Sequence, residues 1–213
     1  MSKSVLYEQD DRIVKITLNR PDTRNALSGD IIEGLVEYIQ KADKDKNVGC
    51  VILTGAGKSF SSGGNLQEIK DMTTKDQMTQ AQLEDWYRFG IQKIPVTMNS
   101  IDVPVVAAVN GHAIGAGNDL CTMCDIRIAG EDAKFSESFL RIGIIPGDGG
   151  SWFLPKIIGL ARANEMILTC DVLDAKKALD WGLVSKVVPN ENLIAEAQQL
   201  AKKIAAQPPE ASR

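Results

Sequence analysis

Two apolar segments, each followed by a glycine-rich turn, constrain this chain more than any other feature. Residues 50–54 lead to the turn at 59–66, and residues 103–109 lead to the turn at 110–120. Each turn precedes a predicted helix start, where backbone N–H groups have no partner within the helix. Glycine lets the backbone come close to another group. If the two turns face each other, they can aim two N–H donors at one oxygen, which is the design of an oxyanion hole.

Apolar strands alternate with amphipathic segments along the rest of the chain. Besides the two strands above, the periodicity predicts strands at 5–8, 13–18, 126–129 and 184–188. Helices are predicted at 29–46, 66–72, 115–124, 151–158, 160–169, 175–181 and 191–206. A further long helix is predicted over 75–100, with an interruption near Pro95. Inner strands that are apolar throughout are typical of an α/β fold with a largely parallel sheet covered by helices.

Length and charge narrow the class of protein. The 213 residues fit one large domain or one and a half, and the net charge of −4 argues against a nucleic-acid binder. No apolar run approaches the ~20 residues that span a membrane. Met1–Ser4 run directly into strand-like sequence, so no signal peptide is expected and the predicted location is cytoplasmic.

Two segments resemble nucleotide-binding motifs only in part. Residues 55–59 look like the end of a phosphate-binding loop, but Ile52 stands where the first glycine of that motif is required. The second turn lacks the G-x-G-x-x-G spacing of a dinucleotide site. Neither segment therefore predicts a nucleotide site.

The cysteines and the single histidine give weak functional signals. Cys121 and Cys124 form a C-x-x-C pair, but the chain has neither a second pair nor a cluster of histidines. We expect reduced cysteines packed as small apolar residues, rather than a zinc or redox site. His112 has no evident partner, which favours a packed or surface role over that of a catalytic base.

Several segments together resemble the enoyl-CoA hydratase/isomerase (crotonase) superfamily, in the right order and over essentially the whole chain. They are residues 16–21, 25–27, 51–55, 60–66, 104–125, 143–150 and 178–184. The resemblance implies a spiral of ββα units with helical cover, formed by a core domain at 1–190. Residues 191–213 would begin a C-terminal helical segment that continues further in the family, so a truncated segment is expected here. It also implies a homotrimer or hexamer.

The resemblance implies an acyl-CoA substrate whose thioester oxygen becomes an enolate oxygen. By position, the two donors to that oxygen are the backbone N–H groups of Gly64 and Ala116. Because coenzyme A is part of the substrate, no separate cofactor and no metal are expected. The segments that contact coenzyme A in the family correspond to Arg24, Ala26, Ser62, Gly63 and Asn65. Arg24 would either pair with a phosphate of coenzyme A or be a solvated surface arginine.

The acidic residues depart from the family pattern. Hydratases of the family use two glutamates that share one water; the first position is Asp119 here, and the second is Phe139. Phe139 cannot transfer a proton and is expected to line an acyl pocket, while Glu137 lies two residues too early. Asp119 is our first candidate for proton transfer, with helix capping as its structural alternative. Asp148 is the second, because some relatives place an active-site aspartate there; its alternative is an ordinary turn residue.

The sequence therefore predicts an acyl-CoA-processing enzyme, an enoyl-CoA hydratase or isomerase. Isomerisation fits at least as well as hydration, because it needs one shuttling base and hydration usually needs two groups. Thioester hydrolysis and decarboxylation on the same oxyanion hole remain alternatives. A catalytically silent acyl-CoA-binding protein is the alternative from another class.

Overall fold

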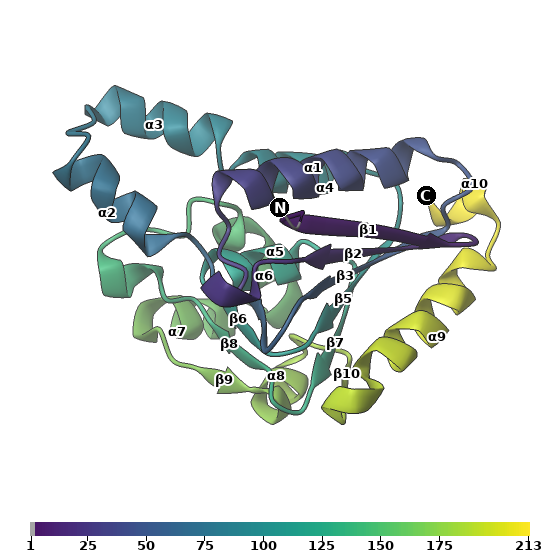
Figure 1. Cartoon of the computed structure of the whole chain (residues 1–213). Coiled ribbons are helices and arrows are strands. Elements are labelled where there is room, and N and C mark those ends of the chain that lie inside the picture. Colours follow the sequence, from purple (N-terminus) through teal and green to yellow (C-terminus); the bar gives the residue numbers. More distant parts are fainter. Residues whose placement is uncertain (1–2) are drawn as a thin grey trace.

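Two β-sheets lie at the centre of the molecule (Figure 1). The computed structural model describes residues 3–213, with the backbone only for residue 73. Met1 and Ser2 lie outside the described residues, and the expectation that no signal peptide is present falls partly on them. The larger sheet has, in spatial order, the strands β1 (Val5–Asp10), β2 (Ile13–Leu18), β3 (Cys50–Gly55), β5 (Val105–Val109), β7 (Ile126–Gly130) and β10 (Lys186–Val188).

The larger sheet is parallel except at one edge. Strands β1 and β2 form an antiparallel hairpin, and every other neighbouring pair is parallel. The inner strands β3 and β5 are buried along their whole length. Their continuous apolar sequences therefore reflect burial on both faces of the sheet.

The smaller sheet is built from short strands that the sequence-based prediction had treated mostly as turn. It contains β4 (Ser59–Ser61), β6 (His112–Ile114), β8 (Lys134–Ser136) and β9 (Leu173–Asp174). The first three are parallel, and β9 pairs with β8 in the antiparallel sense. Because β3 leads to β4, β5 to β6 and β7 to β8, the chain passes from one sheet to the other in each repeat. The predicted spiral of ββα units is confirmed.

Helices cover both faces of the larger sheet. Helices α1 (Gly29–Lys44) and α4 (Lys93–Ser100) pack together on one side, and α9 (Leu193–Ala205) packs against β2, β3, β5 and β7. Side chains alternate along β3, so Val51 and Leu53 join the core under α1. Cys50 and Ile52 face α9 instead.

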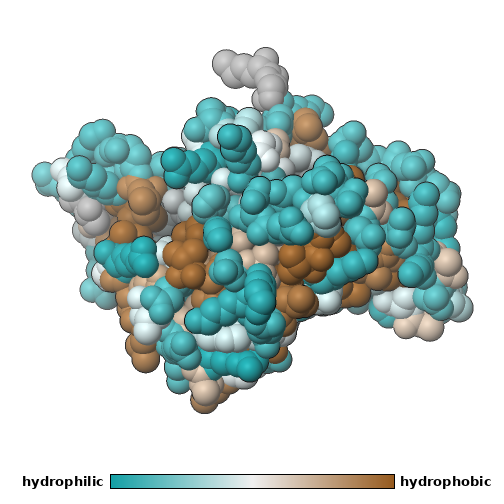
Figure 2. All heavy atoms as spheres, turned by 90° about the horizontal axis from the view of Figure 1, so that it is seen from below, coloured by the Kyte–Doolittle hydropathy of each residue, from teal (hydrophilic) through white to brown (hydrophobic). Residues whose placement is uncertain are grey.

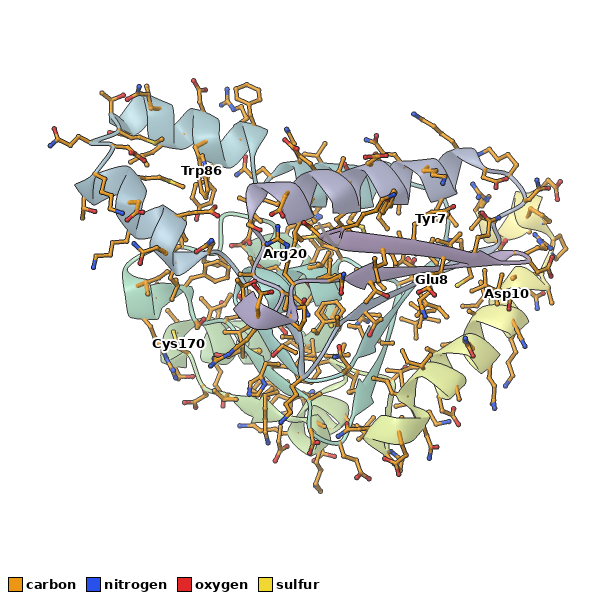
Figure 3. The ribbon with its side chains drawn as sticks, in the orientation of Figure 1. Tyr7, Glu8, Asp10, Arg20, Trp86 and Cys170 are labelled. Atoms are coloured by element: carbon orange, nitrogen blue, oxygen red, sulfur yellow. The ribbon has the colours of Figure 1, made fainter. Side chains whose placement is uncertain are left out.

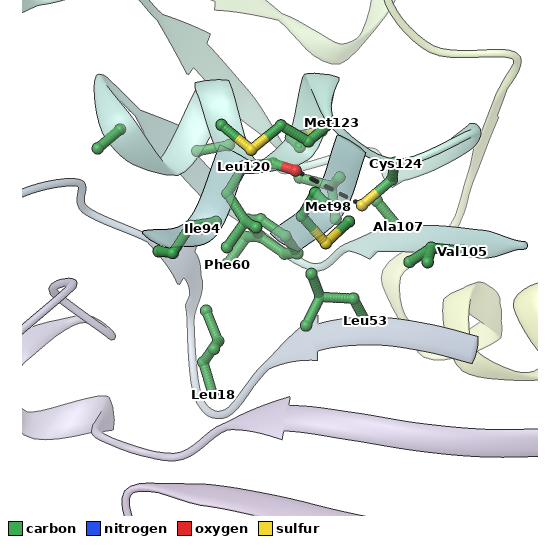
Figure 4. Close-up of a cluster of buried hydrophobic side chains, with 14 of the residues drawn as sticks. Leu18, Leu53, Phe60, Ile94, Met98, Val105, Ala107, Leu120, Met123 and Cys124 are labelled. Atoms are coloured by element: carbon green, nitrogen blue, oxygen red, sulfur yellow. Dashed lines mark hydrogen bonds between the residues drawn. The ribbon is translucent and has the colours of Figure 1, made fainter. Parts of the chain in front are cut away.

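The core beside the second glycine-rich turn holds a short buried helix, α5 (Ala116–Thr122), in place. Figure 4 shows Leu120 of α5 in one cluster of buried side chains with Leu18, Leu53, Phe60 and Met98, which come from four other elements. Leu18, Leu53, Phe60 and Leu120 are fully buried. Because α5 carries Asp119, this packing fixes the position of that carboxyl group.

The remaining helices surround the two sheets. They are α2 (Leu66–Thr74), α3 (Gln80–Phe89), α6 (Gly150–Ile158), α7 (Leu160–Thr169), α8 (Ala175–Trp181) and α10 (Pro209–Ser212), with 3-10 turns at Pro21–Thr23, Phe139–Ile142 and Asn190–Asn192. Figure 1 shows α2 and α3 extending away from the sheets. No helix within residues 3–213 has the length and apolar character needed to cross a membrane.

The predicted helix at 75–100 is wrong in two respects: its first helix, α3, begins only at Gln80, and its interruption lies elsewhere. The break falls between α3 and α4, where Gly90 ends α3 with a backbone conformation outside the helical region. Pro95 lies inside α4, at its third residue. Proline is tolerated in the first turn of a helix, since the backbone N–H groups there have no helical partner.

Candidate active site

The first glycine-rich turn is held against the segment that contains Arg24. The Ser62 N–H donates to the Arg24 carbonyl at 2.9 Å, and the Leu27 N–H donates to the Gly63 carbonyl at 2.8 Å. Gly63 has a φ of +88°, and a Cβ there would lie 2.4 Å from the Ile114 carbonyl oxygen. Only glycine fits this position, because it permits both the positive φ and the close approach of the two chains.

The two glycine-rich turns meet in the structure. A Cβ at Gly63 would lie 3.3 Å from the Ala116 nitrogen. In the second turn, a Cβ at Gly117 would lie 2.4 Å from the Ser61 carbonyl oxygen, so α5 packs directly on β4. Ala116 is the first residue of α5, a position whose N–H has no helical acceptor. Within residues 3–213, neither the Gly64 nor the Ala116 N–H donates to a protein acceptor.

Both predicted donors line one cavity. It has a volume of about 310 Å³, and Gly63, Gly64 and Ala116 contribute to its wall. The rest of the wall is mainly apolar and includes Leu66, Ile69, Trp86, Ile91, Phe139, Ile142 and Ile144. Figure 3 shows Trp86 pointing from α3 toward the side on which α2 lies. Such a wall suits an apolar group attached to a polarised carbonyl.

A groove of about 430 Å³ adjoins this cavity and shares Ser62 and Gly64 with it. Four of the predicted substrate-binding residues line the groove: Arg24, Ala26, Ser62 and Asn65. The other two, Gly63 and Phe139, line the cavity. The exposed His112 also lines the groove.

Asn65 has a structural role in addition to its place in the groove. Its side-chain oxygen accepts from the backbone N–H groups of Gln67 and Glu68 and thereby caps α2. Such a cap satisfies N–H groups that the helix leaves unpaired. Asn65 therefore fixes where α2 starts and how Leu66 and Ile69 face the cavity.

Three carboxyl groups from three separate segments meet beside the cavity. Asp119 lies within α5, Glu137 follows β8, and Asp148 lies in the turn before α6. Asp119 and Glu137 are 0% exposed and Asp148 is 3% exposed. The Asp119 side chain lies within hydrogen-bonding reach of both Glu137 and Asp148. Of the three residues, Asp148 lines the cavity, and the other two lie deeper.

A glycine makes room for the central carboxyl group. A Cβ at Gly150 would lie 2.0 Å from Asp119 Oδ1. Asp119 does not cap a helix, because it lies inside α5, whose N-cap is Gly115. Asp148 accepts a hydrogen bond from its own backbone N–H, as its turn position leads one to expect. Asp148 Oδ1 is buried and has no hydrogen-bond partner within residues 3–213.

Burial raises the pKa of all three carboxyl groups. Loss of solvation is the largest cause for each, because it disfavours the charged form. The pKa of Asp119 lies well above its ordinary value, since the charges of Glu137 and Asp148 add to the effect. The pKa of Glu137 rises to about 7. Carboxyl groups of this kind can hold and release protons near neutral pH.

Two residues near the acids were not among the predicted site residues. Glu137 lies two residues before the family position of the second acid, yet the structure places it beside Asp119. Tyr87 of α3 lines the cavity, and after burial the charges of Asp148 and Asp119 raise its pKa. No sequence pattern marks either residue, because each reaches the site through the tertiary fold.

The cysteines lie outside this site. All four are free and buried, as expected for packed apolar residues. Burial raises the pKa of Cys121 to about 12 and also raises the pKa of Cys124. The C-x-x-C pair therefore lacks the thiolate character of a reactive pair.

Comparison with known proteins identifies the family. Residues 8–213 match the family model described as enoyl-CoA hydratase/isomerase. The chain is 40% identical over 198 residues to a probable mitochondrial enoyl-CoA hydratase of Dictyostelium discoideum, covering 93% of this chain and 68% of that protein. It is 36% identical over 211 residues to a probable enoyl-CoA hydratase of Mycobacterium tuberculosis, covering 99% and 79%.

The fold agrees with the sequence comparison. The crystal structure of enoyl-CoA hydratase from Bacillus anthracis superposes with a TM-score of 0.88 at 36% identity, covering 98% of this chain and 79% of that one. The chain belongs to the enoyl-CoA hydratase/isomerase family. The family predicted from the sequence is confirmed.

Proposed function

We propose that this protein is an acyl-CoA-processing enzyme that moves a double bond in an enoyl-CoA thioester. One observation carries the proposal: two unpaired backbone N–H groups and one buried carboxyl group line the same cavity. The Gly64 and Ala116 N–H groups would hold the thioester oxygen as it gains negative charge. Asp148 would remove a proton from one carbon of the acyl chain and return it to another.

The direction of electron flow follows from these positions. The C–H bond breaks as the proton goes to Asp148, and its electron pair moves into the conjugated system that ends at the thioester oxygen. Asp148 then gives the proton to another carbon of the acyl chain: its O–H bond breaks, a C–H bond forms, and the thioester carbonyl group is restored. The adjoining groove, lined by Arg24 and Ser62, would hold the coenzyme A part of the substrate.

Isomerisation is favoured over hydration because Phe139 occupies the place of the second acid. Phe139 is 7% exposed and lines the cavity. It makes this part of the wall apolar, which does not favour an ordered water. Hydration is the second candidate, supported by the names of the relatives described above.

Incubation with 3-enoyl-CoA and 2-enoyl-CoA esters tests the proposal. We expect 3-enoyl esters to become conjugated, measured by ultraviolet absorbance, without loss of the 2-enoyl product to hydration. Asp148→Asn should lower kcat by about 10²- to 10⁴-fold, the usual contribution of a proton-transferring side chain. Loss of 2-enoyl absorbance as water adds would favour hydration. Binding of acyl-CoA with no turnover of any ester would favour a silent binding protein.

We propose a homotrimer or hexamer, as the family resemblance implies, and we retain the cytoplasmic location expected from the sequence as a proposal. Large apolar side chains at the surface are consistent with assembly: Trp152, Leu160 and Leu168 are each more than 60% exposed. Figure 2 shows apolar groups reaching the surface on the face seen from below. Sedimentation analysis of the purified protein would measure the assembly state.

A further inference from the structure

We propose that Glu137 is a positioning residue that shares protons with Asp119 and, through Asp119, with the cavity-lining Asp148. The three carboxyl groups would then form a buried chain that lets Asp148 act either as a base or as an acid. This proposal rests on the proposed function for its catalytic part. The sharing of protons itself is a property of the protein without substrate.

The contacts define the order of the three carboxyl groups. Asp119 lies within hydrogen-bonding reach of both other carboxyl groups, whereas Glu137 and Asp148 interact only through their charges. The Asn118 side-chain amide donates to Glu137 Oε1 at the deep end. Asp148 lines the cavity at the other end. The order is therefore Glu137, Asp119, Asp148.

The unpaired oxygen atoms indicate where the protons lie. Both oxygens of Asp119, Oε2 of Glu137 and Oδ1 of Asp148 are buried and receive no donor from residues 3–213. Ionised carboxylates only accept hydrogen bonds, so two of them cannot bond to each other. Each of the two carboxyl contacts needs one proton. Two protons shared among three carboxyl groups would satisfy both contacts and leave one negative charge.

That single charge can occupy either end of the chain. When it lies on Asp148, Asp119 donates to Asp148, Glu137 donates to Asp119, and Asp148 is a base. When each proton moves one place toward the cavity, Asp148 becomes an acid. The charge then lies on Glu137, where the Asn118 amide stabilises it. Each transfer breaks one O–H bond and forms another, so the number of protons stays constant.

Other titratable groups lie close to these three carboxyl groups. Tyr87 of α3 lines the same cavity as Asp148, and its pKa is raised by burial and then by the charges of Asp148 and Asp119. Around Glu137, the groups that affect its pKa are Asp119 and Asn118 of α5 and Asp148 of the turn. Burial raises the pKa of Glu137 to about 7, so this carboxyl group is protonated in about half of the molecules at pH 7.

Infrared spectroscopy of the protein without substrate tests proton sharing directly. The C=O stretch of protonated carboxyl groups should persist at pH 7, where ordinary Asp and Glu side chains, with pKa values of about 4, are ionised. Glu137→Gln should remove part of this signal. Glu131→Gln is the matched control, because Glu131 is exposed and does not line the cavity. An unchanged signal in Glu137→Gln, or no signal in the native protein, would overturn the proposal.

The pH dependence of isomerisation tests the role of Glu137 in the reaction. We expect Glu137→Gln to lower kcat by about 10- to 100-fold, as the loss of a partner that orients a metal ligand does in metalloenzymes. It should also lose one ionisation between pH 6 and 8, with acyl-CoA affinity unchanged. A lower kcat with the native pH profile would indicate a structural role only and would contradict the proposal.

A second variant keeps the test decisive if Glu137→Gln fails to fold. Asn118→Ala removes the donor to Glu137 and should move the same ionisation to higher pH, because that donor stabilises the charged form. An ionisation that stays in place would count against the proposal. If the native protein isomerises no enoyl-CoA but keeps the infrared signal, the proposed reaction fails and the shared protons are established.

Discussion

At the scale of single residues, the missing side chain of Gly150 decides where Asp119 can lie. Gly150 is the first residue of α6, and its Cα packs against the Asp119 carboxyl group. A protein interior is too closely packed for a Cβ 2.0 Å from an oxygen atom. Either the carboxyl group or the start of α6 would have to move.

We therefore predict that Gly150→Ala lowers isomerase kcat by at least tenfold, because it shifts Asp119 away from Asp148. Gly29→Ala is the matched control: Gly29 is also the first residue of a helix, and a Cβ there meets no atom within 4 Å. The control should keep its activity and its melting temperature. Steady-state kinetics and thermal unfolding measure both variants, and equal activity in the two would contradict the prediction.

At the scale of elements, small residues let α9 lie directly on the larger sheet. Ala197 and Ala201 are 0% exposed and face the strands. Ala205, one turn further, packs against Gly49, where a Cβ would lie 2.8 Å from the Ala205 Cα. The alanine side of α9 is therefore an interior surface with no room for a larger side chain.

Ala201→Leu should lower the free energy of unfolding by about 1–3 kcal/mol, the usual cost of overpacking a core. Ala195→Leu places the same substitution on the exposed side of α9 and should change stability by less than about 0.5 kcal/mol. Urea denaturation measures both variants. Equal stability would show that α9 can move outward freely, contrary to the packing described.

At the scale of the whole molecule, the buried acids oppose folding as the pH rises. The folded state raises the pKa of Asp119, Glu137 and Asp148, so it binds more protons than the unfolded state above pH 4 or so. The contribution of these groups to the free energy of unfolding is fully present below their ordinary pKa values. It is lost as the pH rises through their raised pKa values in the folded state. Asp30 has a lowered pKa and acts in the opposite sense, at more acidic pH.

The free energy of unfolding should therefore fall as pH rises from about 5 to above 7, through the Glu137 pKa of about 7. Each additional proton bound by the folded state contributes a slope of about 1.4 kcal/mol per pH unit. Glu137→Gln should make the dependence shallower, and Glu131→Gln should leave it unchanged. Urea denaturation at several pH values checks this, and a stability that rises over the same range would contradict it.

Much of the architecture was predictable because it depends on local pattern. The apolar sequences of β3 and β5 and the periodic stripe of α1 indicate burial directly, whatever lies against them. The short strand β6 was not predicted, because three residues within a glycine-rich turn give no periodic signal. The break before α4 was placed too late, because Pro95 is a stronger local signal than Gly90.

The sequence by itself determined the family and the two glycine-rich turns, because glycine spacing and strand pattern are local properties, and the family resemblance then pointed to Gly64 and Ala116 as candidate donors. Only the tertiary structure brought Glu137 and Tyr87 to Asp119 and Asp148. Asp119 and Glu137 are 18 residues apart along the chain and come from different elements. Their proton affinities depend on burial and on each other's charge, and both exist only once the chain has folded.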